Sequence, residues 1–247
     1  MKFDDHFSGH AGQYARYRPQ YPAELFRWIA RRAPGNDTVW DCATGNGQAA
    51  LGLADHFKRV FASDASTSQV AHGYPNPRIA YFAATAYHSG LATHSMHAVT
   101  VAQALHWFHF DSFYREVKRI LRKDGILAAW CYTRPRADGP IDDIIYKYWA
   151  DIVGPYWPEE RRYVDDEYRT VPFPFRDDKV RSFESRRSWN LHQLLGYLST
   201  WSAAKYYRDD NSENAIDAIR TPLSHHWGDP ETEQTVRWPI HLRIGRV

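Results

Sequence analysis

The sequence predicts a doubly wound α/β fold, in which a parallel sheet is covered by helices on both faces. Two observations carry this prediction. Through about half of the chain, short apolar stretches that suit strands alternate with stretches that suit helices. In addition, the stretch VWDCATGNGQAA, from Val39 to Ala50, has the order strand, glycine turn, helix. At 247 residues the chain is long enough for one such domain with an additional region.

The N-terminal segment YARYRPQYP, residues 14–22, precedes a helix-like stretch. Its two prolines hold the chain extended, so Tyr14, Tyr17, Arg18 and Tyr21 are displayed from a stiff segment. The segment serves either as a capping arm or as a lid whose arginine and tyrosine donors meet an anion. Local sequence leaves both roles open.

The glycine turn offers a place for a ligand. Gly45 and Gly47 allow positive φ and a close approach of the backbone, and Asp41 at the strand end offers an acceptor to a ligand hydroxyl or amine. With Ala50, however, the two glycines also match the dinucleotide fingerprint. The turn alone therefore does not separate a dinucleotide site from another nucleotide site, or from a turn that binds nothing.

A second carboxylate follows the next predicted strand. A helix over 48–57 leads into a strand over 59–64, and Asp64 stands 23 residues after Asp41. This is close to the spacing at which an acidic residue takes ribose hydroxyls. Two carboxylates at neighbouring strand ends favour an adenosine ligand that carries little phosphate. The competing interpretation is that Asp64 only caps the helix that begins at Ser66.

The middle of the chain continues the alternation. The near-continuous apolar run over 97–105 is typical of a strand buried on both faces of a parallel sheet. Strands are also predicted over 78–82 and 126–132. An amphipathic helix over 113–121 lies between the strands predicted at 97–105 and 126–132.

The C-terminal half predicts further helices and two more strands. A helix and loop are expected over 141–157, a strand over 181–191, a helix over 192–207 and a closing strand over 236–247. Pro239 suggests a bulge or an edge position in the closing strand.

Composition narrows the class of protein. The formal net charge of +2 does not indicate nucleic acid or an anionic membrane as a partner. The high aromatic content, 15% with 10 Trp, predicts an aromatic pocket. Cys42 and Cys131 are too few for a disulfide framework, and no apolar run suits a membrane span or a signal peptide. We therefore expect a cytoplasmic protein.

Other catalytic signatures are absent from the sequence. His106, His109, His225 and His226 have no cysteine or acidic partner at metal-ligand spacing, so no metal is expected. No G-x-S-x-G motif is present, so a serine hydrolase of that type is unsupported.

Several motifs together resemble a known family. In order along the chain, VWDCATGNG, SDAS, AATA, AQALHWF and LRKDGILAAW are similar to the motifs of class I S-adenosylmethionine-dependent methyltransferases of type 11. The branch that includes ubiquinone/menaquinone-type and trans-aconitate-type small-molecule enzymes is the most similar, and the resemblance is close over 14–132. It implies a Rossmann-like seven-stranded sheet, with the last strand antiparallel, helices on both faces and an inserted helical cap. The expected divisions are a lid segment and first helix (1–35), a cofactor-binding core (36–134), an inserted cap (135–180), and strands and helices completing the sheet (181–247).

The resemblance also assigns site residues. Asp41, Ala43, Gly45 and Gly47 would wrap the methionine part of the cofactor, and Asp64 would take the ribose hydroxyls. The full cofactor set is Tyr14, Arg18, Asp41, Ala43, Gly45, Asn46, Gly47, Asp64, Ala65, Gln69, Thr85, Ala86, Gln103 and Ala104. The substrate set is Tyr21, Trp107, Tyr132, Trp149, Trp157 and Trp201, with Tyr156 as a further candidate, and about half of these aromatics are expected to be core. Ala43 departs from the family, whose members usually have glycine there.

The predicted function is transfer of a methyl group from S-adenosylmethionine to a small, partly apolar acceptor, for which a carboxylate-bearing molecule is one option. A carboxylate nucleophile needs no base, whereas a phenol, enol or amine needs one, and His106 is the candidate. Arg18 or Arg16 would meet the acceptor's anionic group, or Arg18 would instead hold the methionine carboxylate. The alternatives are an NAD-dependent dehydrogenase and a non-catalytic nucleotide-binding module. A monomer or homodimer is expected, without nucleic acid or membrane partners.

Overall fold

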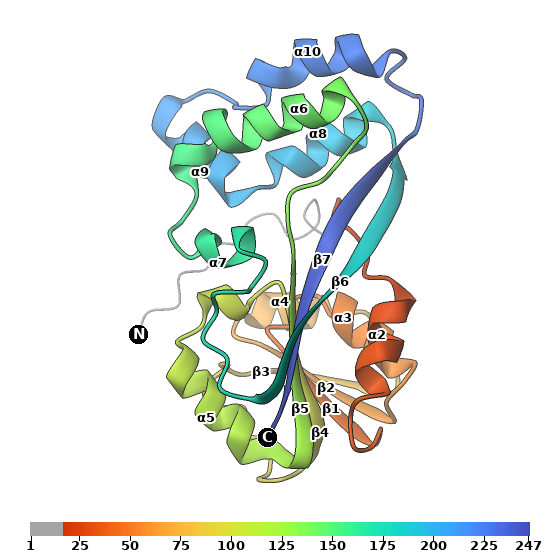
Figure 1. The fold of residues 1–247 in the computed structure, drawn as a ribbon, viewed down its shortest axis with the longest axis vertical. Helices are drawn as coiled ribbons and strands as arrows, with labels where there is room; N and C mark the ends of the chain where they lie inside the picture. The colour runs from red at the N-terminus through yellow and green to blue at the C-terminus, as the bar shows by residue number, and fades with distance from the viewer. Residues whose placement is uncertain (1–16) are drawn as a thin grey trace.

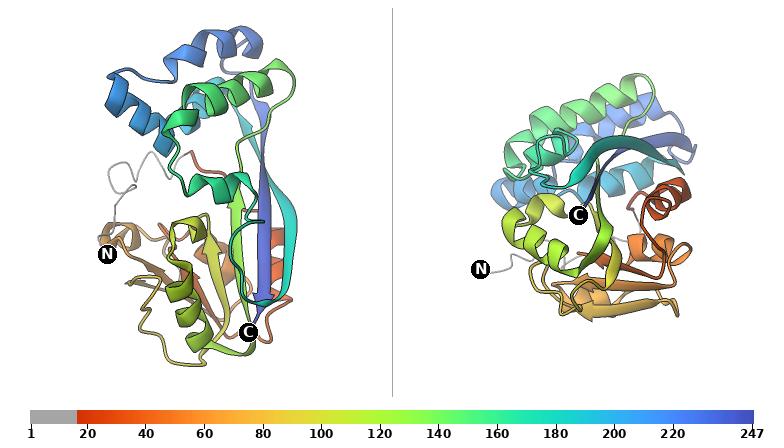
Figure 2. Two further views of the ribbon diagram at one scale, coloured as in Figure 1. Left: turned by 60° about the vertical axis from the view of Figure 1, so that its left-hand side comes forward. Right: turned by 60° about the horizontal axis from the view of Figure 1, so that its bottom comes forward.

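The computed structural model describes residues 17–247, except for the side chains of 177–180, and shows one mixed sheet with helices around it (Figures 1 and 2). The strands are β1 (Thr38–Cys42), β2 (Arg59–Asp64), β3 (Ile79–Ala83), β4 (Met96–Ala102), β5 (Leu121–Tyr132), β6 (Arg176–Trp189) and β7 (Gln234–Arg246). The α-helices are α2 (Ala23–Ala30), α3 (Gln48–Ala54), α4 (Thr67–Ala71), α5 (Phe110–Ile120), α6 (Pro140–Lys147), α7 (Arg161–Asp165), α8 (Leu191–Ser199), α9 (Ser202–Asn211) and α10 (Asp217–Trp227). Short 3-10 turns are η2 (Leu105–Trp107) and η4 (Gly154–Tyr156), and η3 (Tyr148–Ile152) is a π-helical turn. In the described part of the chain, no helix is long and apolar enough to cross a membrane.

The strand order is β3-β2-β1-β4-β5-β7-β6. Strands β1 to β5 are parallel to one another, whereas β7 is antiparallel to both β5 and β6. The seven-stranded, doubly wound sheet with an antiparallel last strand is therefore confirmed.

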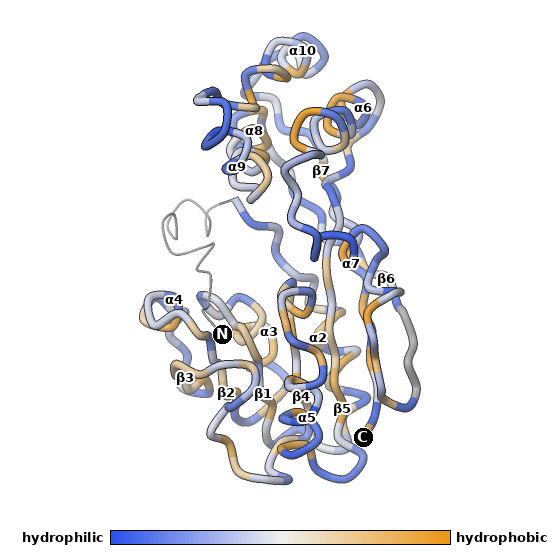
Figure 3. Tube along the Cα trace, turned by 90° about the vertical axis from the view of Figure 1, so that its left-hand side faces the viewer, coloured by the Kyte–Doolittle hydropathy of each residue, from blue (hydrophilic) through white to orange (hydrophobic). Residues whose placement is uncertain are grey.

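Both faces of the sheet are buried. The strands are apolar at consecutive positions, and consecutive side chains point to opposite faces. Val39 and Ile126 belong to the core on the side of α2 and α3, whereas Trp40 and Leu127 belong to the core formed with α5. Neighbouring residues of one strand thus support opposite layers, as expected when helices cover both faces. In Figure 3 these central strands carry much of the hydrophobic colour.

A group of helices lies beyond the carboxyl end of β5. Helices α6, α8, α9 and α10 gather there, and the long strands β6 and β7 extend from the parallel sheet to meet them (Figure 1). Their apolar residues, including Ile145, Leu194 and Leu223, belong to one core cluster. This helical region draws on two stretches of chain, so it extends beyond the 135–180 segment expected as the cap and includes helices expected to complete the sheet.

Several element boundaries differ from expectation. The apolar run over 97–105 leaves the strand at Gln103, which has φ +55°. The helix expected over 192–207 is two helices, because Trp201 between them has extended backbone. Strand β6 begins at Arg176, five residues before the expected Arg181. The prediction missed these residues because the first of them are polar and lack the apolar pattern of a buried strand.

The expectation for Pro239 was wrong. Strand β7 lies between β5 and β6, and its register with β6 continues through the pair Glu184–Pro239 without a bulge. Proline is tolerated there because the ladder with β5 ends at the adjacent pair, Tyr132–Ile240. Beyond it, the Pro239 carbonyl accepts a hydrogen bond from the Thr133 N–H at 3.1 Å.

Candidate functional site

The glycine turn joins β1 to α3 at the carboxyl edge of the parallel strands. Gly45 has φ +58° and Gly47 has φ +87°, both in the left-handed region that favours glycine. At Gly47 a Cβ would lie 2.0 Å from the Tyr81 hydroxyl oxygen. Among the described residues, one heavy atom lies within 4 Å of a Cβ built at Gly45, namely Gln69 Oε1 at 3.9 Å. The two glycines thus have different roles, since Gly47 makes room for Tyr81, whereas the described residues leave room for a Cβ at Gly45.

Ala43 shares this strained geometry, with φ +54°. The position therefore takes the left-handed conformation that favours glycine, and alanine adopts it at a cost of about 1 kcal/mol. The turn is held against β2, because the Thr44 N–H donates to the Ser63 carbonyl at 2.9 Å. The methyl group of Ala43 has not prevented the turn from forming.

Asp64 ties the glycine turn to the end of β2. Its Oδ2 accepts from the Gly45 N–H at 2.9 Å, and its Oδ1 accepts from the Ser66 N–H at 2.9 Å. The cap of α4 is Ser66, whose hydroxyl accepts from the Gln69 N–H at 3.3 Å, so the competing interpretation of Asp64 as the cap is wrong. Asp64 is half-buried, and its carboxylate adjoins Gly45 of the turn. This position suits an acceptor for ribose hydroxyls.

Asp41 has a different environment from the one expected. Its side chain is fully buried, with Oδ2 accepting from the Thr44 hydroxyl at 2.5 Å and Oδ1 accepting from the Thr100 hydroxyl at 2.7 Å. Burial raises the pKa of Asp41 to about 6, against the lowering effect of the two threonine hydrogen bonds. The expectation that Asp41 contacts the ligand is therefore corrected: it stands behind the turn and joins it to β4.

The other residues predicted for the adenosine side gather around Asp64. The Asp64 carbonyl accepts from the Ala84 N–H at 3.0 Å, which places the segment containing Thr85 and Ala86 next to the end of β2. Ala65 and Thr85 are exposed. Asn46, Gln69 and Ala86 are half-buried. The structure thus brings three separate sequence motifs to one place, and their contacts with the cofactor remain predictions.

Gln103 is also placed differently from the expectation. Its amide nitrogen donates to the Tyr132 carbonyl at 3.2 Å, and its amide oxygen accepts from the Tyr132 N–H at 2.7 Å. Both polar ends of the Gln103 side chain therefore join β4 to β5. Ala104 follows it, half-buried, at the start of η2.

The candidate base, His106, does not suit that role. It is 6% exposed, and its Nδ1 lies 2.8 Å from the Tyr168 hydroxyl. Burial, with a smaller contribution from the charge of Arg161, lowers the pKa of His106 to about 3. An imidazole with this pKa is a weak proton acceptor at neutral pH. Trp107, expected in the acceptor site, is half-buried with its ring centroid 4.9 Å from that of His106.

The arm reaches the same edge of the sheet. Arg18 Nη1 donates to the Tyr132 hydroxyl at the end of β5. Tyr21 packs against the rings of Trp130 and Tyr132, at 5.5 and 6.5 Å between centroids. Gln48, the first residue of α3, donates its side-chain N–H to the Pro19 carbonyl at 3.0 Å. The arm therefore runs from the glycine turn to the end of β5. Of the residues predicted on this arm, Tyr14 and Arg16 lie outside the described residues.

Three of the predicted substrate aromatics, Trp149, Trp157 and Trp201, lie together, whereas Tyr21, Trp107 and Tyr132 lie on the arm, in η2 and on β5. The Trp157 indole N–H donates to the Trp149 carbonyl at 3.2 Å, and the rings of Trp157 and Trp201 lie 5.4 Å apart. Trp201 and Tyr132 are buried and Trp149, Tyr156 and Trp157 are half-buried. Trp201 packs within the main core cluster, so its role there is structural.

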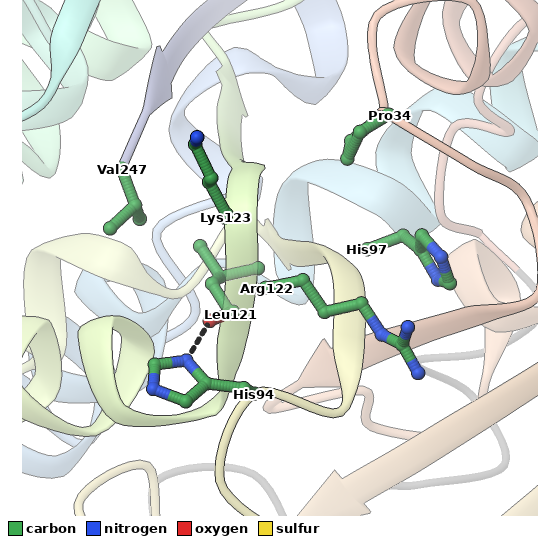
Figure 4. A pocket seen from close by; sticks show the side chains of 7 residues that line it. All are labelled: Pro34, His94, His97, Leu121, Arg122, Lys123 and Val247. Atoms are coloured by element: carbon green, nitrogen blue, oxygen red, sulfur yellow. Dashed lines mark hydrogen bonds between the residues drawn. The ribbon is translucent and has the colours of Figure 1, made fainter.

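A cavity of about 550 Å³ lies away from this edge (Figure 4). Its lining includes Leu121 and His97, which belong to the amino-terminal ends of β5 and β4. It is therefore at the opposite edge of the sheet from the glycine turn and is not part of the cofactor site.

Sequence reasoning missed three residues near the site. The Tyr168 hydroxyl is hydrogen-bonded to His106. Tyr197 is buried close enough to Arg18 and Tyr132 for these two residues to influence its pKa. Arg161 lies on α7 beside η2. Burial raises the pKa of Tyr197 to about 12. Each belongs to the C-terminal half, where the motif resemblance is weak.

The geometry fits an adenosine-bearing cofactor. The open space beside Gly45, the half-buried Asp64 carboxylate and the adjoining Ala65 form a cradle at the carboxyl edge of the sheet, where open α/β folds bind ligands. Across residues 17–247, no three His, Cys, Asp or Glu side chains are grouped as a metal site.

Comparison with known proteins agrees with this site. The family model described as "Methyltransferase domain" matches residues 40–129. A Dictyostelium discoideum protein assigned as a methyltransferase is 30% identical over 252 residues, covering 99% of this chain and 96% of that protein. CRG1 of Saccharomyces cerevisiae, assigned as an S-adenosylmethionine-dependent methyltransferase, is 29% identical, covering 75% and 66%. A solved structure assigned as a type II methyltransferase from Anaeromyxobacter dehalogenans is 38% identical, covers 93% and 98%, and has a TM-score of 0.88.

The chain belongs to the class I S-adenosylmethionine-dependent methyltransferases. It is an enzyme, and its cofactor is S-adenosylmethionine. The dehydrogenase and binding-module alternatives are therefore set aside.

Proposed function

We propose that the acceptor is a small, partly apolar molecule that carries an anionic group, most simply a carboxylate. The observation that carries this proposal is the position of Arg18, whose guanidinium donates to the hydroxyl of Tyr132 at the end of β5 and lies near the buried Tyr197. A guanidinium can hold a carboxylate in two parallel hydrogen bonds. We also propose that the enzyme acts in the cytoplasm.

The residues at the site suit an acceptor that needs no deprotonation. Bound S-adenosylmethionine supplies a methyl group on a sulfonium, and the carbon–sulfur bond breaks with its electron pair moving to sulfur. A carboxylate oxygen is already anionic, so the chain's task is to align it and exclude water. His106, with a pKa of about 3, supports this acceptor class because it is a weak base for a phenol or amine.

Asp64 and the turn at Gly45 would hold the adenosine part of the cofactor. Asp41, buried behind the turn, would maintain its shape through Thr44 and Thr100. The arm would close over the site, since it is bonded to Gln48 beside the turn.

Labelled methyl transfer to a panel of small acids, phenols and amines tests the proposal. The acids are phenylacetate, 4-phenylbutyrate, hexanoate and fumarate, and the enzymes are wild type, Arg18→Ala and Arg187→Ala. Arg187 donates to the Gln20 side chain at 2.9 Å, so its loss loosens the arm while keeping the Arg18 cation. We expect transfer to an acid by wild type and Arg187→Ala, with at least a tenfold loss in Arg18→Ala.

Affinity for S-adenosylhomocysteine separates the two roles of Arg18. If Arg18→Ala binds S-adenosylhomocysteine like wild type, its loss of transfer assigns it to the acceptor. If the variant loses that affinity, Arg18 holds the methionine carboxylate instead. Transfer only to neutral amines or to nucleic acid would reject the acceptor class.

A further inference from the structure

Arg161 projects from the helical side of the molecule toward the end of β4. It is the first residue of α7, which packs against η2, the turn that follows β4 and contains His106. Its charge contributes to the lowered pKa of His106 and opposes the raised pKa of Cys131, so the guanidinium is close to the ends of β4 and β5. It therefore stands between the methyl-transfer edge of the sheet and the helical region.

The guanidinium is fixed in position but retains donors. Its Cζ lies 4.4 Å from the centroid of the Trp157 ring, and its Nε donates to Asp165 Oδ1 at 2.9 Å. Only 16% of the Arg161 side chain is exposed. Within residues 17–247, no acceptor is hydrogen-bonded to its two terminal Nη groups, and neither Nη group is sealed from solvent.

The neighbouring Arg162 makes the contrast clear. Its side chain is 59% exposed and forms an ion pair with Glu159 at 2.7 Å, as expected of a surface arginine. Arg161 is also ion-paired, but through Nε to Asp165, and it is much less exposed, at 16%. Both guanidinium groups lie over an aromatic ring, Arg161 at 4.4 Å from Trp157 and Arg162 at 5.0 Å from Tyr163, so what sets Arg161 apart is its burial and the two Nη groups at the end of its planar fork. This is the geometry in which arginine binds a carboxylate through both Nη groups.

We propose that Arg161 is a specificity-determining residue that binds the anionic group of the methyl acceptor. Trp157, which is half-buried, orients the guanidinium and supplies an apolar surface for the body of the acceptor. This inference rests on the proposed acceptor class, and it holds whether Arg18 contacts the acceptor or the cofactor. The ligand is thus a small carboxylate with an apolar or aromatic body.

Kinetics with matched variants test the inference. The variants are Arg161→Ala, Arg161→Lys and, as control, Arg162→Ala, assayed with the acid of the panel above that wild type methylates best. We expect kcat/KM to fall 10- to 100-fold in Arg161→Ala, mainly through KM, with partial recovery in Arg161→Lys and no change in Arg162→Ala. Affinity for S-adenosylhomocysteine should stay within twofold of wild type in all three.

A binding comparison distinguishes recognition of charge from a structural role. With S-adenosylhomocysteine bound, wild type should bind the acid at least tenfold more tightly than the corresponding carboxamide, and Arg161→Ala should lose this preference. An unchanged KM for the acid, or equal weakening of acid and carboxamide in Arg161→Ala, would overturn the role of Arg161 alone. Failure of wild type to methylate any acid would instead overturn the acceptor class and this inference with it.

Discussion

Replacing Gly47 by alanine should destabilise the fold far more than the same change at Gly45. Both glycines have positive φ, +87° and +58°, so alanine is strained at both by about 1 kcal/mol, partly offset by its lower entropy in the unfolded chain. At Gly47 alone, the new Cβ would lie 2.0 Å from the Tyr81 hydroxyl oxygen, whose hydroxyl donates to the Tyr74 carbonyl. Such overpacking adds about 1–3 kcal/mol.

We therefore expect a loss of about 2–4 kcal/mol in the free energy of unfolding for Gly47→Ala and about 1 kcal/mol or less for Gly45→Ala. Urea unfolding at equilibrium measures both values. The effects on S-adenosylhomocysteine affinity should have the opposite order. Gly45→Ala should weaken binding more than Gly47→Ala, because the Gly45 methyl group would enter the space assigned to the cofactor. Equal stability losses in the two variants, or unchanged S-adenosylhomocysteine affinity in a folded Gly45→Ala, would refute the separate roles of these glycines.

Three further predictions concern the titratable residues. Asp64→Ala should weaken S-adenosylhomocysteine binding by about 1.5–3 kcal/mol, measured by calorimetry with Asp64→Asn as the milder control. Unchanged affinity would mean that Asp64 only accepts the hydrogen bonds of Gly45 and Ser66 and does not contact the cofactor. Because the folded-state pKa of Asp41 is raised from 3.8 to about 6, wild type should gain about 2.5 kcal/mol of stability relative to Asp41→Asn as pH falls from 8 to 4, and a constant difference in urea unfolding would contradict this. Since the pKa of His106 is lowered to about 3, kcat/KM for an acid acceptor should be flat between pH 6.5 and 8.5 in wild type and His106→Gln; a step near pH 6.5 that disappears in the variant would restore His106 as a base.

The parallel half of the sheet was predictable because the local sequence of each strand is sufficient to identify it. Runs such as that in β4 are apolar at nearly every position, since both faces are covered. The helical region was less predictable, because an amphipathic pattern shows that a helix buries one face without showing which surface covers it. Helix α8 was therefore expected on the sheet although Leu194 packs with the helical region.

The candidate site was predictable to the level of strand ends. The sequence spacing correctly placed Asp41 and Asp64 at neighbouring strand ends. Sequence spacing, however, carries no information on whether a side chain is buried. Thr100, 59 residues from Asp41, closes over that carboxylate and removes it from the ligand side. Arg161 lies in a highly charged stretch whose simplest interpretation is a solvated surface, so only tertiary structure separates it from Arg162.

A crystal structure of the chain with S-adenosylhomocysteine is the most direct test of the site. The account predicts that the Asp64 carboxylate accepts hydrogen bonds from the ribose hydroxyls and that the ligand lies in the space beside Gly45. Asp41 should remain buried against Thr44 and Thr100, without touching the ligand. A ligand bonded to Asp41, or bound away from Asp64 and the glycine turn, would contradict the assignment.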